Sequence, residues 1–403
     1  MTTPQALDGF YAWKRLAVTL VIAMVANVGM WAIVVIMPAV QQEFDIDRAD
    51  TSLPYTVTMI GFALGSVFIG RAVDRVGITL SLIGAALCVA AGYTLAAVST
   101  SVYMLCACQL LIGLGTAAGF GPLIADISHW FMKRRGIAVA ITASGNYLSG
   151  AIWPILLSPV LAADGWRSVY LILAAVTLVT LIPLSLLLRR RISFEATQSA
   201  DAVASANAHS VQFSPRALQW MLVAAGLGCC VAMAMPQVHI VSLCVDLGYG
   251  PAAGAEMLSL MLLGGVGSRI VFGLIADRLG GVPTLLIGST LQCIALFFYL
   301  PFDGLASLYV VSLVFGLSQG GIVPSYALIV REYMPAREAG QRVGIVLMAT
   351  IVGMAIGGWM SGWIYDLTGS YQMAFINGIL WNVMNIAIMA TIFMKSRSRA
   401  QPA

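Results

Sequence analysis

The residue most able to do chemistry in this sequence is Arg269, because it lies inside a long apolar segment, in the stretch S-R-I-V-F-G-L-I-A-D-R-L-G that runs from Ser268 to Gly280. A guanidinium keeps its charge in apolar surroundings, and at the centre of a bilayer it costs at least about 2.5–3.5 kcal/mol. Such a group needs a partner. That partner is either structural, a backbone carbonyl or an acid on another helix, or it is the carboxylate of a substrate. The default for an ionisable residue inside a membrane favours the substrate.

The composition indicates that the chain crosses a membrane many times. Of its 403 residues, 60% are apolar and 9% are charged, whereas soluble domains carry about 25% charged residues. The mean hydropathy is +0.92. No basic region followed by a short apolar core and a small-residue cleavage site opens the chain, so the first apolar run is predicted to remain as a span.

A membrane helix needs about 20 mostly apolar residues, and the chain divides into twelve such runs. They are predicted at 16–40, 52–71, 78–98, 102–130, 135–161, 167–188, 216–243, 252–275, 282–301, 306–330, 340–365 and 371–394. An even number of spans places both termini on one side. Most of the 21 lysines and arginines fall in segments on that side, with Arg48 and Arg167 as exceptions. The positive-inside rule therefore predicts cytoplasmic termini.

The twelve runs divide into two halves of six. Residues 189–215 begin with three arginines and continue with Ser, Ala, Gln and Asn, so they cannot bury a core and are predicted to be a cytoplasmic linker between 1–188 and 216–403. A turn with the pattern G-x-x-x-D-R-x-G, from Gly70 to Gly77, recurs 203 residues later from Gly273 to Gly280. Such a repeat is typical of transporters built from two parallel halves.

This doubled turn resembles the signature of the major facilitator superfamily, and the resemblance covers both halves. It implies an all-α membrane protein of twelve helices in two six-helix halves. In that superfamily the motif locks the cytoplasmic gate in the outward-open state. By this resemblance the gating residues are Asp74, Arg75, Asp277 and Arg278.

A narrower resemblance is to the monocarboxylate transporter family. The stretch from Trp130 to Gly145, W-F-M-K-R-R-G-I-A-V-A-I-T-A-S-G, is similar to its fifth-span signature, and D-G-F-Y-A-W from Asp8 to Trp13 looks like a loose copy of its first-span signature. Arg269 stands where that family and the related oxalate:formate antiporters keep an arginine for the substrate carboxylate. The segments Gly165–Arg167 and Gly362–Tyr371 resemble common superfamily features and support the fold alone.

Matching the motifs of these relatives indicates which positions would join Arg269 in a substrate site. Taken singly, each is explained as well by helix packing; they gain weight as a set. The additional substrate-binding residues predicted in this way are Phe120, Asn146, Tyr147, Gln319, Leu347 and Thr350. No lysine lies in spans seven to twelve before Lys395, which counts against a dicarboxylate and favours an acid with a hydrocarbon tail.

Proton coupling is implied by the resemblance, but the sequence offers no obvious carrier. Vertebrate members of the family have an acid where this chain has Gly265, and their first-span lysine is absent. Asp126 and Glu256 are the candidate proton carriers, although Asp126 is expected to pair with the basic cluster 133–135 and Glu256 lies near the outer end of its span. One hypothesis is that the carboxylate and its proton enter together.

Other functional classes find little support. None of the three histidines, His129, His209 and His239, has a His or Cys at ligand spacing, and no nucleophile and base or phosphate loop is found, so neither a metal, a cofactor nor an enzyme is predicted. The prediction is a monomeric secondary transporter in a bacterial inner membrane, moving a lactate- or pyruvate-like monocarboxylate with a proton, with no nucleic-acid partner. An organic anion or dicarboxylate exchanger and a non-transporting solute sensor are the alternatives.

Overall fold

A computed structural model describes residues 8–131, 134–190, 213–334 and 336–397, and in these segments every regular element is helical. The apolar runs found in the sequence become the helices because a backbone without water must satisfy its own hydrogen bonds. In order they are α1 (Phe10–Ala26), α2 (Val28–Phe44), α3 (Arg48–Val76), α4 (Ile78–Ala97), α5 (Val102–Thr116), η2 (Ala117–Gly119), α6 (Gly121–Ser128), α7 (Arg135–Leu186), α9 (Pro215–Asp246), α10 (Gly250–Leu279), α11 (Gly281–Phe298), α12 (Leu305–Gln319), α13 (Ile322–Tyr333), α14 (Ala336–Thr368) and α15 (Gln372–Arg397).

Eleven helical segments of the described chain are long and apolar enough to cross a membrane, where the sequence predicts twelve. The difference lies in α7, whose 52 residues include both the fifth and the sixth predicted runs. A straight helix of that length would measure about 78 Å, more than twice the hydrocarbon thickness of a bilayer. Gly165 interrupts α7 with φ 77°, a left-handed conformation that favours glycine. The count of eleven therefore includes α7 as one segment, although Gly165 interrupts this helix.

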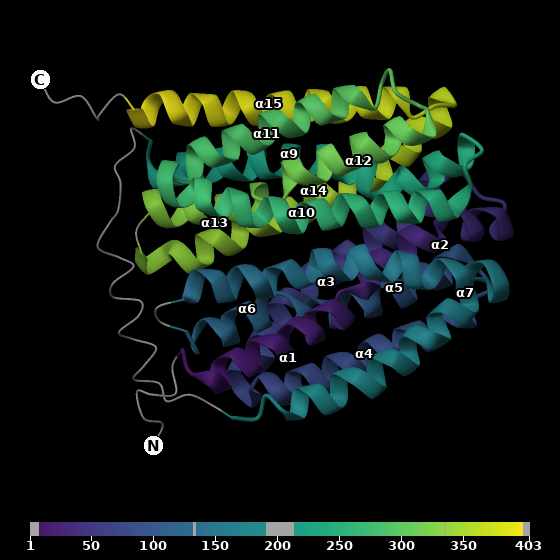
Figure 1. Ribbon diagram of the computed structural model, residues 1–403, viewed down its shortest axis with the longest axis horizontal. Coiled ribbons are helices and arrows are strands. Elements are labelled where there is room, and N and C mark those ends of the chain that lie inside the picture. Colours follow the sequence, from purple (N-terminus) through teal and green to yellow (C-terminus); the bar gives the residue numbers. More distant parts are fainter. Residues whose placement is uncertain (1–7, 132–133, 191–212, 335, 398–403) are drawn as a thin grey trace, which may run out of the picture.

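The helices form two groups, which Figure 1 shows one above the other: α1–α7 make the N-terminal bundle, and α9–α15 make the C-terminal bundle. Helix α1 begins and α15 ends at the same end of the molecule (Figure 1). We call this end the turn end, because it also holds Gly77 and Gly280, and we call the opposite end the latch end. Most of the predicted linker 189–215 lies outside the described residues, which stop at 190 and resume at 213.

The sequence repeat is also a repeat of backbone conformation. Gly77 ends α3 and begins α4 with φ 87° and ψ 167°, and Gly280 does the same between α10 and α11 with φ 82° and ψ 173°. A residue with a side chain is strained in this region of φ, so glycine is needed where the chain reverses in one residue. The final glycine of each G-x-x-x-D-R-x-G turn therefore has a defined structural role.

The two bundles meet along α3 with α14 and along α7 with α10. Small residues allow the close approach. A Cβ atom built on Gly362 of α14 would lie 2.7 Å from the carbonyl oxygen of Arg48, and one built on Gly265 of α10 would lie 3.0 Å from the ring of Tyr147. Glycine on one bundle thus faces a large side chain or the backbone on the other.

Candidate functional site

Arg269 lies at the junction of the two bundles with its side chain almost fully buried. The residue is 8% exposed. Its Nε donates to the carbonyl of Gly320 at 3.2 Å, and Nη1 donates to the carbonyl of Ala143 in the other bundle at 2.5 Å. The guanidinium carbon lies 4.3 Å from the centre of the Tyr147 ring. Arg269 therefore bridges α10, the α12–α13 break and α7.

No carboxylate pairs with Arg269 among the described residues. A guanidinium has five N–H donors, and the bonds to the two carbonyls use only Nε and Nη1, while Tyr147 lies against the group. The two carbonyls supply partial negative charge but no full counter-ion. The two carbonyl contacts are those expected if Arg269 has a structural role. The N–H donors that these contacts do not use can bind an anion.

Gln319, at the end of α12, is fully buried beside Gly320, whose carbonyl Arg269 contacts. Its Oε1 accepts from Nε2 of Gln237 on α9 at 2.5 Å. Its own Nε2 has no hydrogen-bond partner among the described residues. A buried polar atom left without a partner costs about 1–3 kcal/mol. Gln319 therefore presents an unused donor on the residue that precedes Gly320, whose carbonyl Arg269 contacts.

Asn146 and Tyr147 come from α7, on the opposite side of Arg269. Nδ2 of Asn146 donates to Oδ1 of Asn27 at 3.4 Å, and the Asn146 backbone carbonyl accepts from the indole of Trp31 at 3.1 Å. The side-chain oxygen Oδ1 of Asn146 is buried without a hydrogen-bond partner in the described structure. Asn27 separates α1 from α2 and also donates to the carbonyl of Gly119 at 2.9 Å. Helix breaks in two spans thus meet beside Asn146.

The remaining predicted site residues, Phe120, Leu347 and Thr350, have other polar or backbone features in the structure. Phe120 lies where η2 gives way to α6, with φ −126° and ψ −88°. The hydroxyl of Thr350 donates to the carbonyl of Leu347 on its own helix, and its methyl group faces Gly226 of α9. Arg269 makes no hydrogen bond with Phe120, Leu347 or Thr350, and no ring contact with Phe120, within the described part of the chain.

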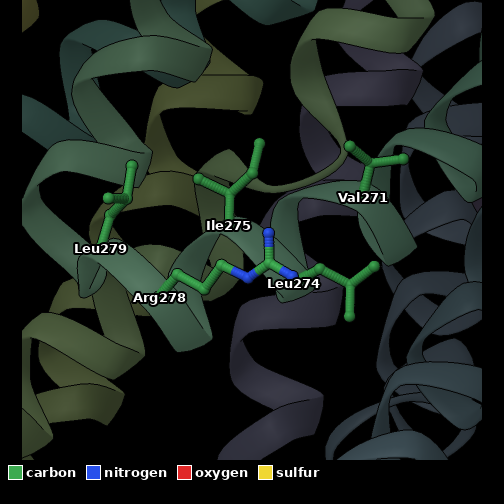
Figure 2. Close-up of a pocket in the computed structure, with 5 residues that line it drawn as sticks. All are labelled: Val271, Leu274, Ile275, Arg278 and Leu279. Atoms are coloured by element: carbon green, nitrogen blue, oxygen red, sulfur yellow. The ribbon is translucent and has the colours of Figure 1, made fainter.

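A hollow of about 440 Å³ lies along the end of α10, and it is not the Arg269 site. Figure 2 shows its lining, which comes from one helix: Val271, Leu274, Ile275, Arg278 and Leu279. Successive helical residues are rotated by about 100°, so Val271, Leu274, Ile275 and Arg278 lie roughly opposite Arg269 around α10. The hollow is apolar, which suits hydrocarbon better than an organic acid.

At the turn end, Arg75, Asp277 and Arg278 are the predicted gating residues whose side chains the structure describes. Asp277 and Arg278 are exposed, as is Arg75, and none of them has a hydrogen bond or ion pair within the described residues. The Asp74 side chain lies outside what the structure describes. Nearby apolar residues are exposed too, including Phe68 at 58% and Leu274 at 62%. The described polar side chains of the two turns therefore do not join the bundles at the turn end.

The latch end is held by Arg48, the first residue of α3, which is 6% exposed. Its Nη2 forms an ion pair of 2.8 Å with Asp246 at the end of α9, in the other bundle. Its Nη1 donates to the hydroxyl of Tyr371 at 3.2 Å, and its guanidinium lies over the ring of Tyr365 at 4.7 Å. One arginine of the N-terminal bundle thus binds three side chains of the C-terminal bundle.

A helix cap between the bundles adds to this contact. The first backbone N–H groups of α3, at 48 and 49, donate to the two carboxylate oxygens of Asp366 at 2.8 and 2.7 Å. A carboxylate satisfies these N–H groups and favours the positive end of the helix dipole. We call Arg48, Asp246, Asp366 and Tyr371 the latch. The sequence did not predict this contact, although it singled out the segment Gly362–Tyr371, which contains Asp366 and Tyr371, and Arg48 as a rare basic residue on that side.

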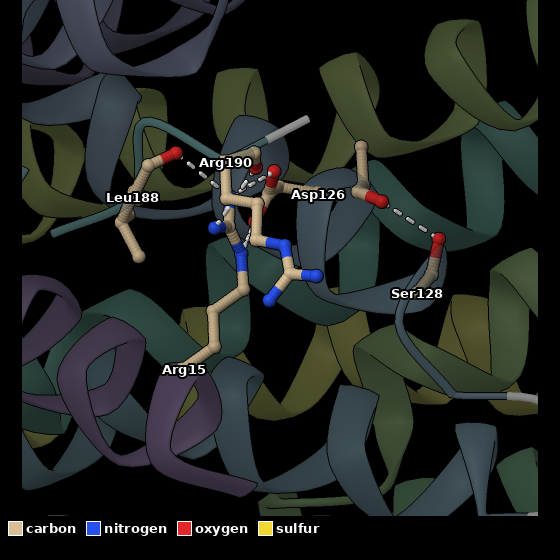
Figure 3. A network of polar contacts seen from close by, with 6 residues as sticks. Arg15, Asp126, Ser128, Leu188 and Arg190 are labelled. Atoms are coloured by element: carbon tan, nitrogen blue, oxygen red, sulfur yellow. Dashed lines mark hydrogen bonds and ion pairs between the residues drawn. The ribbon is translucent and has the colours of Figure 1, made fainter. Parts of the chain in front are cut away.

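Asp126 pairs with a different arginine from the ones expected. Arg15 of α1 forms a bidentate contact with it, Nε to Oδ2 and Nη2 to Oδ1, both at 2.8 Å. Arg15 also donates to the carbonyls of Leu188 and Arg190, as Figure 3 shows. The sequence had suggested the basic cluster 133–135 as the partner. A carboxylate bound in this way joins α1 to α6 within the N-terminal bundle.

Glu256, the other candidate proton carrier, is exposed on α10 close to the latch end. The hydroxyl of Tyr309 on α12 donates to its carboxylate. It lies thirteen residues before Arg269 along α10, about 20 Å away at helical rise. The structure therefore does not bring Glu256 to the central site.

The two family-like signature segments contact each other. The backbone N–H of Asp8 donates to the carbonyl of Trp130 at 3.1 Å, and the N–H of Arg134 donates to the Asp8 carboxylate at 3.2 Å. The rings of Trp13 and Phe131 pack edge to face at 5.1 Å. The weaker N-terminal motif therefore belongs to the same structural unit as the stronger fifth-span motif.

Comparison with known proteins agrees with this architecture. A bacterial homologue of the human lysosomal transporter Spinster, solved in an inward-facing and occupied conformation, superposes with a TM-score of 0.73, covering 98% of this chain and 99% of that one at 14% identity. The same kind of protein in an inward-facing and unoccupied conformation gives 0.71 at 13% identity. At this identity the similarity establishes the fold.

Sequence relatives are more specific. Rat monocarboxylate transporter 13 is 26% identical over 81% of this chain and 74% of its own length, and human monocarboxylate transporter 11 is 26% identical over 93% and 82%. A fungal agnestins efflux protein of Paecilomyces divaricatus is 24% identical over 87% and 80%. The model of the Major Facilitator Superfamily matches residues 19–305 and 241–403, which together span most of the sequence. This chain is a membrane transporter protein of the Major Facilitator Superfamily.

Proposed function

We propose that the protein is a secondary active transporter of small monocarboxylates of the lactate or pyruvate type, working by alternating access as a proton-coupled symporter. The observation that carries the proposal is Arg269, a buried cation between the two bundles with no carboxylate partner in the described chain. An arginine that lacks a counter-ion in an apolar setting is well suited to bind the carboxylate of a substrate. The monocarboxylate transporters among the relatives support this substrate class.

The position of Arg269 suits a central site. It lies ten residues before the end of the 30-residue helix α10, about 15 Å from the turn end at helical rise. Transporters of this kind bind substrate near the middle of the membrane, between their two halves. A site at that depth can face either end in turn.

Two unsatisfied polar atoms support a ligand beside Arg269. They are Nε2 of Gln319, a donor, and Oδ1 of Asn146, an acceptor. A 2-hydroxy or 2-oxo acid carries both a carboxylate and a neighbouring oxygen. We infer that Arg269 takes the carboxylate, that Gln319 donates to the second oxygen, and that Tyr147 covers one face. The positions Phe120, Leu347 and Thr350 stay predictions for the apolar tail.

The topology follows from the same proposal. We infer that the turn end is cytoplasmic and that the membrane is crossed twelve times, with Gly165 joining two crossings within α7. The closed latch and the open turn end then describe an inward-facing conformation. The gating roles of Asp74, Arg75, Asp277 and Arg278 belong to the opposite conformation, in which the turn end closes.

Uptake by purified protein in vesicles tests the assignment. Radiolabelled lactate, pyruvate and a dicarboxylate are offered with and without a proton gradient. Arg269→Ala should lower monocarboxylate uptake about a hundredfold, because a charge-assisted hydrogen-bonded pair contributes roughly 2–3 kcal/mol. Arg269→Lys should be impaired about tenfold, since an ammonium lacks the planar fork. Arg167→Ala, an exposed arginine bound within one bundle, is the matched control and should transport normally.

The same experiment separates the alternatives. Uptake that needs internal substrate and ignores the proton gradient would favour an organic anion or dicarboxylate exchanger. Binding without uptake of any acid would favour a sensor. Full activity of Arg269→Lys would show that the guanidinium has a structural role and would overturn the substrate assignment.

A further inference from the structure

His239 is fully buried in α9, seven residues before Asp246 and therefore inside the latch end. Both of its ring nitrogens are bound. Nδ1 lies 3.0 Å from the hydroxyl oxygen of Tyr371, and Nε2 lies 2.7 Å from the carbonyl oxygen of Gly358 on α14. Tyr371 is also the residue that accepts from Arg48. The histidine is thus linked to the arginine that joins the bundles through one residue, Tyr371, and two hydrogen bonds.

The partners decide which nitrogen holds the proton. The Gly358 carbonyl can only accept, so Nε2 must be the N–H donor. Arg48 can only donate, so the Tyr371 oxygen accepts from it and its hydroxyl proton remains available for Nδ1. Every hydrogen bond in the series from Arg48 through Tyr371 and His239 to Gly358 is therefore satisfied when the imidazole is neutral.

A second proton on the imidazole breaks this series. Nδ1 would become a donor, and the Tyr371 hydroxyl could no longer donate to it. The oxygen of Tyr371 would face two cationic donors, Arg48 and the imidazolium. Two like charges connected through one hydroxyl, in a site closed to water, repel each other more strongly than they would in solvent. This repulsion is relieved when the Arg48 side chain leaves Tyr371, and its departure separates the two bundles at the latch end.

We propose that His239 is a proton-sensing residue of the latch, and that its protonation releases Arg48 and opens the latch end. The opening of the latch end on protonation follows from the contacts above. That the proton comes from an acidic outside, and that the substrate enters at this end, rests on the proposed function. In that setting an external proton would open the side from which the acid enters. The proton then acts at the latch, on His239, which lies 30 residues before Arg269 along the chain.

Other titratable or charged groups face the same region from neighbouring elements. They come from α3, α9, α14 and the start of α15, and include Arg48, Tyr55, Asp246, Tyr365, Asp366 and Tyr371. Protonation of Asp246 or Asp366 would also weaken the latch, because each is a counter-ion or cap for α3. The test must therefore separate the histidine from the two carboxylates.

Thiol labelling from outside measures the opening directly. Ser52 is fully buried on α3, and a Cβ built on Gly362 would lie 3.0 Å from its Oγ. Ser52→Cys, in a protein whose seven native cysteines are replaced, should react with a membrane-impermeant maleimide only when the latch end opens. Thr368→Cys, exposed at the same end, corrects for the change of thiol reactivity with pH.

The labelling ratio of Ser52→Cys to Thr368→Cys should rise at least about fivefold between roughly pH 8 and pH 5, because the contacts of the closed latch favour the neutral imidazole, whereas an imidazole in the opened, solvated latch titrates at the ordinary histidine value of about 6.5. His239→Gln should remove this rise, because an amide at that position can still donate to Gly358 but does not titrate. His129→Gln, which changes an exposed histidine at the turn end, should keep it. Tyr371→Phe removes the connecting hydroxyl and should also abolish the rise, and it serves if His239→Gln does not fold.

A labelling ratio that does not change with pH in the parent protein overturns the proposal. A rise that remains in both His239→Gln and Tyr371→Phe also overturns it. That second result would assign the proton to Asp246 or Asp366. Labelling needs no transported substrate. A histidine-dependent rise in a protein that carries no acid would support this proposal and reject the proposed function. Proton-driven lactate uptake with pH-independent labelling would do the reverse.

Discussion

The two ends of the molecule use charge differently. At the latch end, Arg48 of the N-terminal bundle binds Asp246 and Tyr371 of the C-terminal bundle. At the turn end, the strongest contact, Arg15 with Asp126, stays inside one bundle. An ion pair between the bundles favours the conformation in which its two residues meet. An ion pair within one bundle stabilises the fold of that bundle in every conformation.

This difference means that charged side chains join the two bundles at the latch end, whereas Arg75, Asp277 and Arg278 make no such link within the described residues. The latch gathers an ion pair, a helix cap and a ring contact at one place, so these interactions form and break together. The exposed pair Asp277 and Arg278 has no such partners in this conformation. We expect substitutions at the latch to change the balance of conformations and substitutions within a bundle to change stability.

The largest effect should come from Arg15→Ala. It leaves Asp126 without its bidentate partner, and removal of one member of a buried pair costs about 3 kcal/mol or more. We expect a lower midpoint of thermal unfolding in detergent and no change in the distance between the bundles at either end. Lys14→Ala, an exposed neighbour on α1, is the control. An altered bundle distance would contradict the distinction between the two ends.

Arg48→Ala should act on conformation. It removes the pair with Asp246 and the contact with Tyr371, worth together about 2–3 kcal/mol, or roughly a hundredfold in the equilibrium between closed and open latch ends. Spin labels on the two bundles at the latch end would show a longer distance. Arg167→Ala breaks the pair with Glu43 inside the N-terminal bundle and should leave the distance unchanged.

Asp366→Asn should have a smaller effect of the same kind. The amide can still accept one hydrogen bond from the start of α3 but loses the charge that favours the helix dipole, about 1 kcal/mol or fivefold. Glu332→Gln is a matched comparison, because Glu332 caps α11 through the N–H of Gly281 at 3.0 and 3.1 Å within one bundle. The label distance should change in the first variant alone.

The smallest effect is expected for Asp277→Asn. In the conformation described here the side chain is exposed, so its replacement should change stability by less than about 0.5 kcal/mol. In an Arg48→Ala background, where the turn end closes more often, the same change should reduce the open-latch population. An equal effect in both backgrounds would show that Asp277 is not a conformation-specific gate residue.

The helices were predictable because their cause is local. A run of about 20 apolar residues must become a helix in a bilayer, and the observed bounds, such as α4 at Ile78–Ala97, lie close to the predicted 78–98. The turn glycines were equally visible, since Gly77 and Gly280 recur at one spacing. Arg269 was conspicuous for the same reason: a charge inside an apolar run needs an explanation wherever it lies.

The partners of these residues could not be read from the chain. Arg48 and Tyr371 are 323 positions apart, and Arg15 and Asp126 are 111 apart. Many acids could have served either arginine, and packing alone decides which one lies within reach. Composition therefore predicted an all-α membrane bundle, the repeated turn predicted its two halves, and Arg269 was the predicted central cation. Which charges cross between the parts, and so which end is closed, depends on distances that exist only after the helices have packed.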